Sequence, residues 1–209
     1  MNERAAHLRA GIRVEWFTVG WMLLESIIGI GAGVGTRSIA LTAFGLDSVV
    51  ELVSGTVVLA RLRAESGAPN LTAEQVERIE RRASRIVGWS LFALAAYVVI
   101  QSAYNLLTHA ASEASAAGAA LAVAALIVMP GLATIKRKLA SALDSSALRG
   151  DAAEAVVCAY MAATLLAGLV LRMAFGWWWA DPVAAFGIVY FIVREGREAL
   201  EGEGAGSES

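Results

Sequence analysis

The sequence predicts an all-α membrane protein with six transmembrane helices and both termini in the cytoplasm. Of the 209 residues, 57% are hydrophobic, which is above the roughly half-apolar composition of soluble domains. The apolar runs are close to the roughly 20 residues that a helix needs to cross a bilayer. Basic residues cluster in the segments between alternate runs, as expected of a chain that crosses the membrane repeatedly.

Six apolar runs predict the transmembrane helices, and together they form one transmembrane domain over residues 14–200. The first run carries Glu15 and Glu25 and has no clear signal-peptidase site, so we interpret it as a retained helix. We expect a cytoplasmic N-terminus at 1–13 and a disordered acidic tail at 201–209. The predicted spans are 14–34, 38–60, 86–107, 116–135, 146–171 and 176–193.

The positions of Lys and Arg predict the orientation, because basic residues near the ends of a span remain on the cytoplasmic side. All but two of the 17 basic residues fall on one side of the predicted topology, and Lys136 is counted among the loop residues on that side. Arg37 and Arg172 are the two that fall on the other side. Both termini are therefore predicted to be cytoplasmic.

Capping patterns predict two helix starts. The segment Thr72-Ala73-Glu74-Gln75 has capping-box spacing, so we expect the third helix to begin in the cytoplasm, well before its apolar part. Glu74 and Arg78 are four residues apart, in the order that stabilises a solvated helix. Asp181 precedes Pro182 and is expected to cap the sixth helix.

Spans two and five carry ionisable side chains, which hydrocarbon penalises by several kcal/mol each. Asp47 and Glu51 are four residues apart, so both carboxylates lie on one helical face and can reach one cation. Asp151, Glu154 and Cys158 are spaced by three and then four residues, which again places them on one face. Because ionisable groups inside a membrane normally line an ion pathway, these residues indicate a cation site.

The depths of the two faces agree if the fifth helix begins near Ser146. At about 1.5 Å per residue, Glu51 and Asp47 lie roughly 13 and 20 Å from the cytoplasmic end of span two. A helix that begins near Ser146 places Glu154 and Cys158 at roughly 12 and 18 Å. The two faces can then meet at two shared levels.

With these residues in place, the sequence resembles the cation diffusion facilitator family, six-helix proton-coupled exporters of zinc and related metals. Members of that family carry an Asp- or His-x-x-x-Asp pair in helix two and a His-x-x-x-Asp pair in helix five, which form a tetrahedral site. Asp47 and Glu51 match the first pair, and Glu154 and Cys158 stand at the positions of the second. Similar flanking segments are Ser38-Ile39-Ala40-Leu41, Arg149-Gly150-Asp151-Ala152 and Trp179-Ala180-Asp181-Pro182.

The resemblance covers about residues 14–200, with two departures. The chain ends after helix six, so we expect the short branch that lacks the family's cytoplasmic metal-sensing and dimerising domain. The predicted ligands are three carboxylates and a thiol with no imidazole, so a preference for zinc does not follow from the resemblance alone.

The resemblance implies a secondary transporter that exports a divalent metal cation, zinc or a related transition metal, in exchange for protons. We expect no enzyme chemistry, no permanent cofactor and no nucleic-acid partner. The expected setting is a bacterial inner membrane, where the multi-pass chain forms a homodimer in the lipid bilayer. The predicted metal ligands are Asp47, Glu51, Glu154 and Cys158.

Several interpretations stay open. Glu25 and Asp151 could belong to a second site or to the access path, and Glu25 could instead pair with a polar group. The same fold could serve a non-transporting membrane scaffold or a metal-responsive subunit. Transport of an organic cation would need a larger aromatic cavity than the small residues near Asp47 offer.

Overall fold

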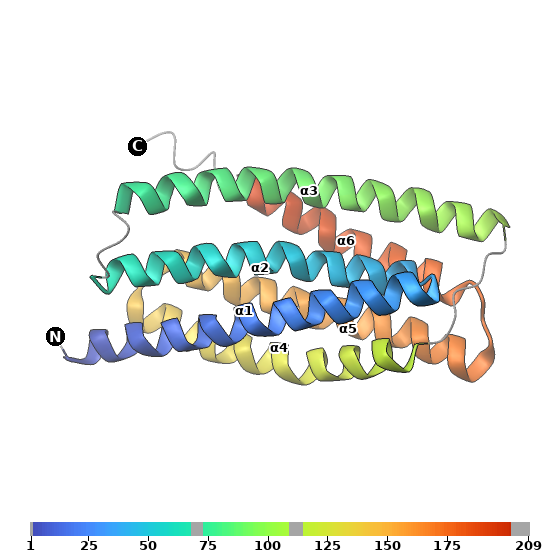
Figure 1. The fold of residues 1–209 in the computed structure, drawn as a ribbon, viewed down its shortest axis with the longest axis horizontal. Coiled ribbons are helices and arrows are strands. Elements are labelled where there is room, and N and C mark those ends of the chain that lie inside the picture. Colours follow the sequence, from blue (N-terminus) through green and yellow to red (C-terminus); the bar gives the residue numbers. More distant parts are fainter. Residues whose placement is uncertain (1, 68–72, 109–114, 202–209) are drawn as a thin grey trace.

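The computed structural model describes residues 2–67, 73–108 and 115–201, and over these residues the chain forms six helices. Successive helices run in opposite directions along a common long axis (Figure 1), which confirms the predicted all-α bundle. Apart from Glu201, where the last helix ends, the predicted disordered tail lies outside the described residues. The helices are α1 (Asn2–Thr36), α2 (Ile39–Glu65), α3 (Ala73–Thr108), α4 (Ala116–Leu143), α5 (Ser146–Phe175) and α6 (Ala180–Glu201).

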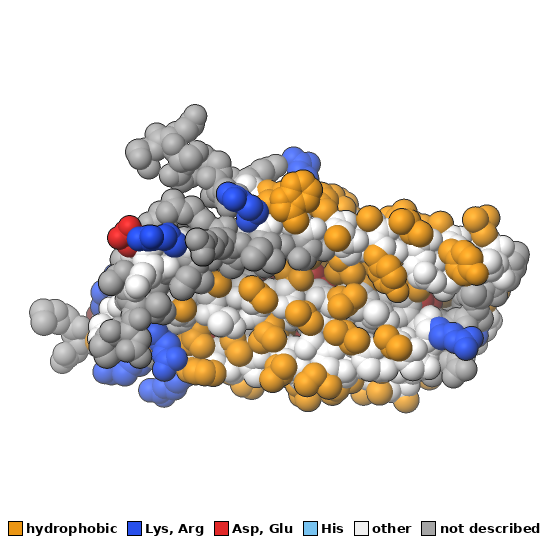
Figure 2. Space-filling view, turned by 45° about the horizontal axis from the view of Figure 1, so that its top comes forward, with side chains coloured by type: hydrophobic (Ala, Val, Ile, Leu, Met, Phe, Trp, Pro, Cys, Tyr) orange, Lys and Arg blue, Asp and Glu red, His pale blue; other side chains and the backbone are white. Residues whose placement is uncertain are grey.

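The outer surface of the bundle is apolar, as expected of a multi-pass membrane protein. In the described part of the chain, α1, α2, α4, α5 and the segment Leu91–Thr108 of α3 are long and apolar enough to cross a bilayer. α6 is not among these helices, although its 22 residues reach roughly 33 Å and so match the thickness of the hydrocarbon layer. Large hydrophobic side chains such as Ile27, Ile100 and Ile127 remain exposed on the outside. Figure 2 shows hydrophobic side chains along the bundle, with most of the visible Lys and Arg toward one end.

The starts of α3 and α5 agree with the sequence prediction, whereas α4 extends into a segment that the sequence assigned to a loop. α3 begins at Ala73, so its first turns precede its apolar part, and Arg78 donates a hydrogen bond to Glu74. α4 continues past the predicted end at 135 to Leu143, because Leu139 and Leu143 extend its buried stripe. α5 begins at Ser146, where the depth argument placed its start.

The extension of α4 corrects the assignment of Lys136. We counted this residue among the basic loop residues, whereas the structure buries it inside the bundle. The run Lys136-Arg137-Lys138 reads as a loop by charge alone, yet only Lys136 lies on the buried side of the helix. Lys136 therefore contributes nothing to the predicted orientation, which rests on the other basic residues.

Glycines bring α1 and α2 into close contact. A Cβ atom added to Gly29 would lie 2.8 Å from Cα of Gly45, and one added to Gly33 would lie 2.5 Å from Oγ1 of Thr42. Gly31, between them on α1, has no neighbour within 4 Å. Because side chains would force the helices apart at these contacts, the glycines set the distance between the buried faces of α1 and α2.

Asp181 joins α6 to α2. Its carboxylate accepts hydrogen bonds from the Ser38 hydroxyl and from the backbone N–H of Ile39, at 3.0 Å for the latter. The sequence assigned Asp181 to its own helix, but the residue lies in the first turn of α6 and its carboxylate accepts from the first backbone N–H of α2, beside the N-cap residue Ser38. This contact fixes one end of α2, the helix that carries the first predicted ligand pair.

Candidate cation site

Three helices bring two carboxylates and a thiol together in the middle of the bundle. Glu25 from α1, Asp47 from α2 and Cys158 from α5 are all buried. The Sγ atom of Cys158 donates to Oε1 of Glu25 at 3.8 Å, and the Glu25 and Asp47 carboxylates interact electrostatically. The close contact of Gly29 with Gly45 lies one turn from Glu25 and less than one turn from Asp47, so it places the two acids near each other.

The second level of the predicted site lies closer to the end of the bundle where α1 begins. Oε1 of Glu154 accepts a hydrogen bond from the Ser54 hydroxyl at 3.2 Å, which fixes the register between α5 and α2. From that contact, Glu51 lies roughly 4.5 Å and Cys158 roughly 6 Å further along the bundle. Asp47 follows roughly 6 Å beyond Glu51. By these distances Glu154 lies opposite Ser54 and not opposite Glu51, and Cys158 lies closer to the level of Glu51 than to that of Asp47.

In this conformation the predicted ligands do not form a closed cage. Among the described residues, no group of three or more His, Cys, Asp or Glu side chains is placed to hold a metal ion together. The interface instead spreads the acids over two levels, with Glu25 as an additional group at the Asp47 level. The assignment of Asp47, Glu51, Glu154 and Cys158 as ligands stays a prediction.

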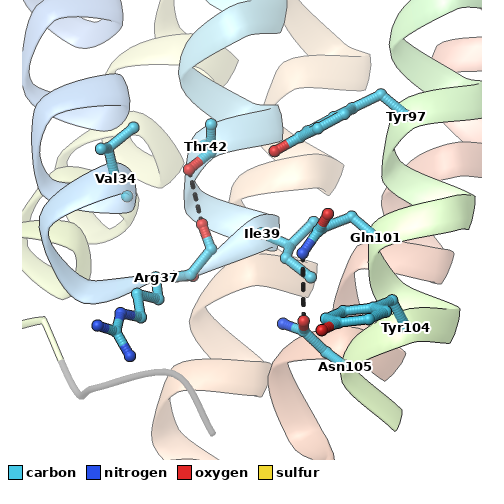
Figure 3. Close-up of a pocket in the computed structure, with 10 residues that line it drawn as sticks. Val34, Arg37, Ile39, Thr42, Tyr97, Gln101, Tyr104 and Asn105 are labelled. Carbon is cyan, nitrogen blue, oxygen red and sulfur yellow. Dashed lines mark hydrogen bonds between the residues drawn. The ribbon is translucent and has the colours of Figure 1, made fainter. Parts of the chain in front are cut away.

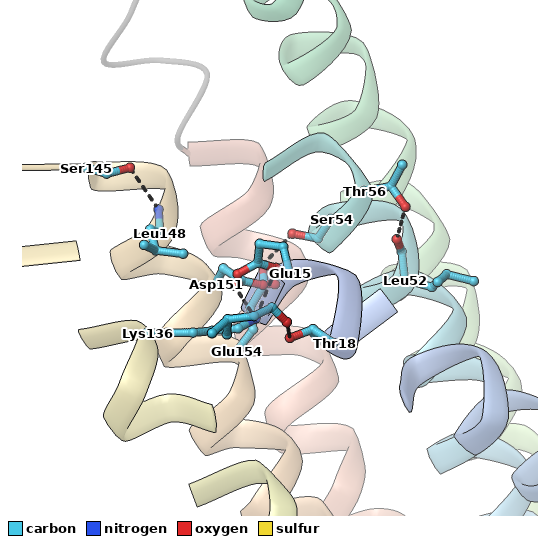
Figure 4. A network of polar contacts seen from close by, with 11 residues as sticks. Glu15, Thr18, Leu52, Ser54, Thr56, Lys136, Ser145, Leu148, Asp151 and Glu154 are labelled. Atoms are coloured by element: carbon cyan, nitrogen blue, oxygen red, sulfur yellow. Dashed lines mark hydrogen bonds and ion pairs between the residues drawn. The ribbon is translucent and has the colours of Figure 1, made fainter. Parts of the chain in front are cut away.

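A buried ion-pair triad joins α1, α4 and α5, nearer than these levels to the end of the bundle where α1 begins. The Nζ atom of Lys136 donates to Oε2 of Glu15 at 3.3 Å and also to Oδ2 of Asp151. The three side chains are only 1%, 0% and 5% exposed, respectively. Figure 4 shows them pointing toward one another from three helices. The sequence predicted Asp151 as a possible access residue, and the structure pairs it with a cation of the chain itself.

Sequence reasoning missed the role of Lys136, although a signal was available. Lys136 follows Met129, Leu132 and Ala133 at the three- and four-residue spacing of one helical face, and all of these residues are buried. A lysine on such a stripe needs a buried partner. Extending the α4 pattern past the charge cluster would therefore have predicted an acidic residue opposite it.

The opposite end of the bundle holds a cavity between α1, α2 and α3. The cavity has a volume of about 420 Å³ and is lined by polar and aromatic side chains, including Thr42, Tyr97 and Gln101. Figure 3 shows these side chains around it, with the Gln101 amide donating to Asn105 at 3.3 Å. Thr42 precedes Asp47 by five residues on α2, or roughly 7.5 Å along the helix. The cavity thus approaches the Asp47 level from the side away from the triad.

Known proteins are similar to this chain in sequence. The family model of the cation efflux transmembrane domain matches residues 17–201, a range that holds every predicted ligand together with Lys136 and Asp151. The chain is also 26% identical over 187 residues to an uncharacterized transporter of Synechocystis sp.. That alignment covers 84% of this chain and 60% of the relative, so the chain spans about three fifths of the relative's length.

Proposed function

Because this chain belongs to the family of cation efflux transmembrane domains, we propose that it carries a divalent metal cation across the membrane in exchange for protons. The membership confirms the resemblance that the residues of helices two and five indicate. Zinc or a related transition metal is the proposed substrate. The proposed direction is out of the cytoplasm, as the name of the cation efflux family suggests.

The cluster of Glu25, Asp47 and Cys158 carries this proposal. Burying a carboxylate within a membrane domain costs free energy that an apolar side chain would not cost. Acids that lie close together there favour a cation between them. Glu51 and Glu154 extend the same interface by one turn. We propose that a small shift of α5 along α2 draws the oxygen and sulfur atoms together around the ion.

The donor set suits several metals. Oxygen ligands favour manganese and magnesium, whereas a thiolate favours softer ions such as zinc. A set that combines carboxylates with one thiolate therefore supports transition metals over magnesium. The preference within that group depends on whether the Cys158 sulfur binds the ion.

Proton exchange follows from the same chemistry. A thiol must lose its proton before it binds a metal, and so must any carboxyl group that burial keeps neutral, so binding releases protons and release of the metal takes them up. A metal that enters from the cytoplasm and leaves on a more acidic side would thus be driven by the proton gradient. The cavity beside Thr42 supports release at that end of the bundle, whereas the Lys136 triad obstructs the other end.

Flux measurements in proteoliposomes test the proposal and separate it from a non-transporting scaffold. The full chain is reconstituted, and internal pH is followed as zinc, manganese, iron, cobalt or nickel is added outside. We expect at least one metal to drive proton movement well above protein-free liposomes. A scaffold or metal-responsive subunit would bind metal without any flux, and that outcome would refute transport.

A further inference from the structure

The buried triad contains two carboxyl groups and one ammonium group. Glu15 and Asp151 supply two carboxylates against the single ammonium of Lys136, so the group carries one net negative charge when all three are ionised. Only Oε2 of Glu15 contacts the ammonium. Oε1 is buried and has no hydrogen-bond partner among the described residues. The triad therefore has room for one further positive charge, either a proton or a second cation.

Stability does not explain such an arrangement. Buried ion pairs seldom stabilise a fold more than apolar side chains of the same size would, because removing the charges from water offsets their attraction. Apolar residues already surround this region, where Leu62, Leu143 and Leu148 form a buried cluster. A leucine or methionine at position 136 would continue that cluster without any cost of charge burial.

The triad also lies in line with the proposed transport site. Asp151 is one turn before Glu154 and two turns before Cys158 on the same face of α5, which places it about 10 Å nearer the end where α1 begins. On the α2 side, a Cβ atom added to Gly55 would be 3.8 Å from Oε2 of Glu15, so this wall has no side chain. Asp151 and Glu154 thus lie in a row on one face of α5, between the triad and Cys158.

We propose that Glu15 and Asp151 form a second cation site, which the Lys136 ammonium fills in this conformation as a tethered substitute for a metal ion. The site would accept a hard divalent cation, since both donors are carboxylates. An arriving ion displaces the ammonium and then passes along the row of acids on α5. Its place on the path rests on the proposed function, but its capacity to bind a cation does not.

The test counts metal ions bound to the full chain in lipid nanodiscs, equilibrated with Mn²⁺ in magnesium-free buffer. Lys136→Gln removes the ammonium, and we expect this variant to bind one Mn²⁺ per chain more than the parent. Adding Glu15→Gln to it should abolish the additional ion. Lys136→Arg keeps the positive charge and should bind no more than the parent.

The comparison separates the second site from the proposed transport site. The number of Mn²⁺ ions bound to the parent, and its decrease in Asp47→Asn, measures binding at the cluster of Glu25, Asp47 and Cys158. The additional ion in Lys136→Gln measures binding at Glu15 and Asp151. If one of the two sites binds no ion, binding at the other site can still be measured.

Poor folding of Lys136→Gln would also be informative. A metal that binds only the folded chain stabilises it by mass action, so preparation with Mn²⁺ should restore a cooperative thermal transition. A folded variant that binds no additional ion would overturn the second site. So would a poorly folded variant that Mn²⁺ does not rescue.

Discussion

The thiol of Cys158 on α5 donates to the Glu25 carboxylate on α1, with 3.8 Å between Sγ and Oε1. This contact connects a residue of the predicted ligand set to an acid whose role the sequence left open. Glu25 also interacts electrostatically with Asp47, so three helices converge there instead of the two that carry the predicted ligand pairs. We therefore propose Glu25 as a candidate ligand of the same site, in addition to its polar contact with Cys158.

Glu25→Gln should weaken metal binding and transport while leaving the fold intact. The substitution removes the charge next to Cys158 and keeps the shape of the side chain. Groups that contact a ligand affect metal affinity by about 10- to 100-fold, so we expect a loss at least in that range. Titration of the purified variant with metal measures it.

Ser26→Ala is the matched control for Glu25→Gln. Ser26 is also buried, but its hydroxyl donates to Leu23 within the same helix. Metal affinity should be unchanged in this variant. Equal losses in both variants would mean that the effect comes from general disturbance of α1.

X-ray absorption can determine whether Cys158 binds the metal, because it is the only cysteine in the chain. In zinc-loaded protein we expect one sulfur neighbour at about 2.3 Å and oxygen neighbours at about 2.0–2.2 Å. Cys158→Ser should lose the sulfur shell and keep the oxygens. A wild-type spectrum with oxygen neighbours alone would remove Cys158 from the ligand set.

Glu154→His should raise the preference for zinc over manganese. The change replaces a hard oxygen donor with an imidazole, which suits zinc better. Competitive uptake into inverted vesicles at fixed pH gives the ratio of the two metals. If a variant that still transports shows an unchanged ratio, Glu154 is not a ligand.

Ser54→Ala is the companion control for Glu154→His. It removes the hydrogen bond to Glu154 without adding a donor atom for the metal. The ratio of zinc to manganese should stay near that of the wild type in this variant, whatever its total rate. A similar change of ratio in both variants would assign the effect to the lost hydrogen bond.

Gly45→Ala should destabilise the bundle. A Cβ atom there would lie 2.5 Å from the backbone nitrogen of Ile30 and 2.7 Å from the carbonyl carbon of Gly29. Overpacking of this kind costs about 1–3 kcal/mol of unfolding free energy. It should also separate Glu25 from Asp47 and so lower metal affinity. Unfolding in a denaturing detergent measures the first effect.

Gly31→Ala provides the comparison on the same helix. No atom lies within 4 Å of the added Cβ, and alanine favours a helix over glycine by about 1 kcal/mol. Stability should therefore be unchanged or higher. A loss equal to that of Gly45→Ala would show that the close contact of α1 with α2 is not what the glycines provide.

The sequence predicts the helices and the faces of α2 and α5 that carry the ionisable residues, because both depend on local periodicity. The four-residue spacings of Asp47 with Glu51 and of Glu154 with Cys158 define helical faces without knowledge of the fold. The contact between Glu25 and Cys158 depends on how α1 crosses its neighbours, which single-helix spacing does not encode.

Charge clusters and caps misled the sequence interpretation at two points. Lys136 lies beside two other basic residues, so composition assigned it to a loop, whereas the apolar stripe of α4 continues through it. Asp181 has the sequence setting of a helix cap, and it does cap a helix, but that helix is α2. In both cases the partner is distant in sequence, so only the tertiary structure identifies it.

The central claim is that the acids of α2 bind the transported cation, and metal uptake into inverted vesicles by Asp47→Ala and Glu51→Ala tests it most directly. Both variants should fold, because a buried carboxylate costs stability where it stands, and gel filtration with thermal unfolding checks this. We expect each to lose at least about 100-fold of metal uptake, since each removes a charged ligand. Uptake at the wild-type rate in both folded variants would contradict the assignment of the site.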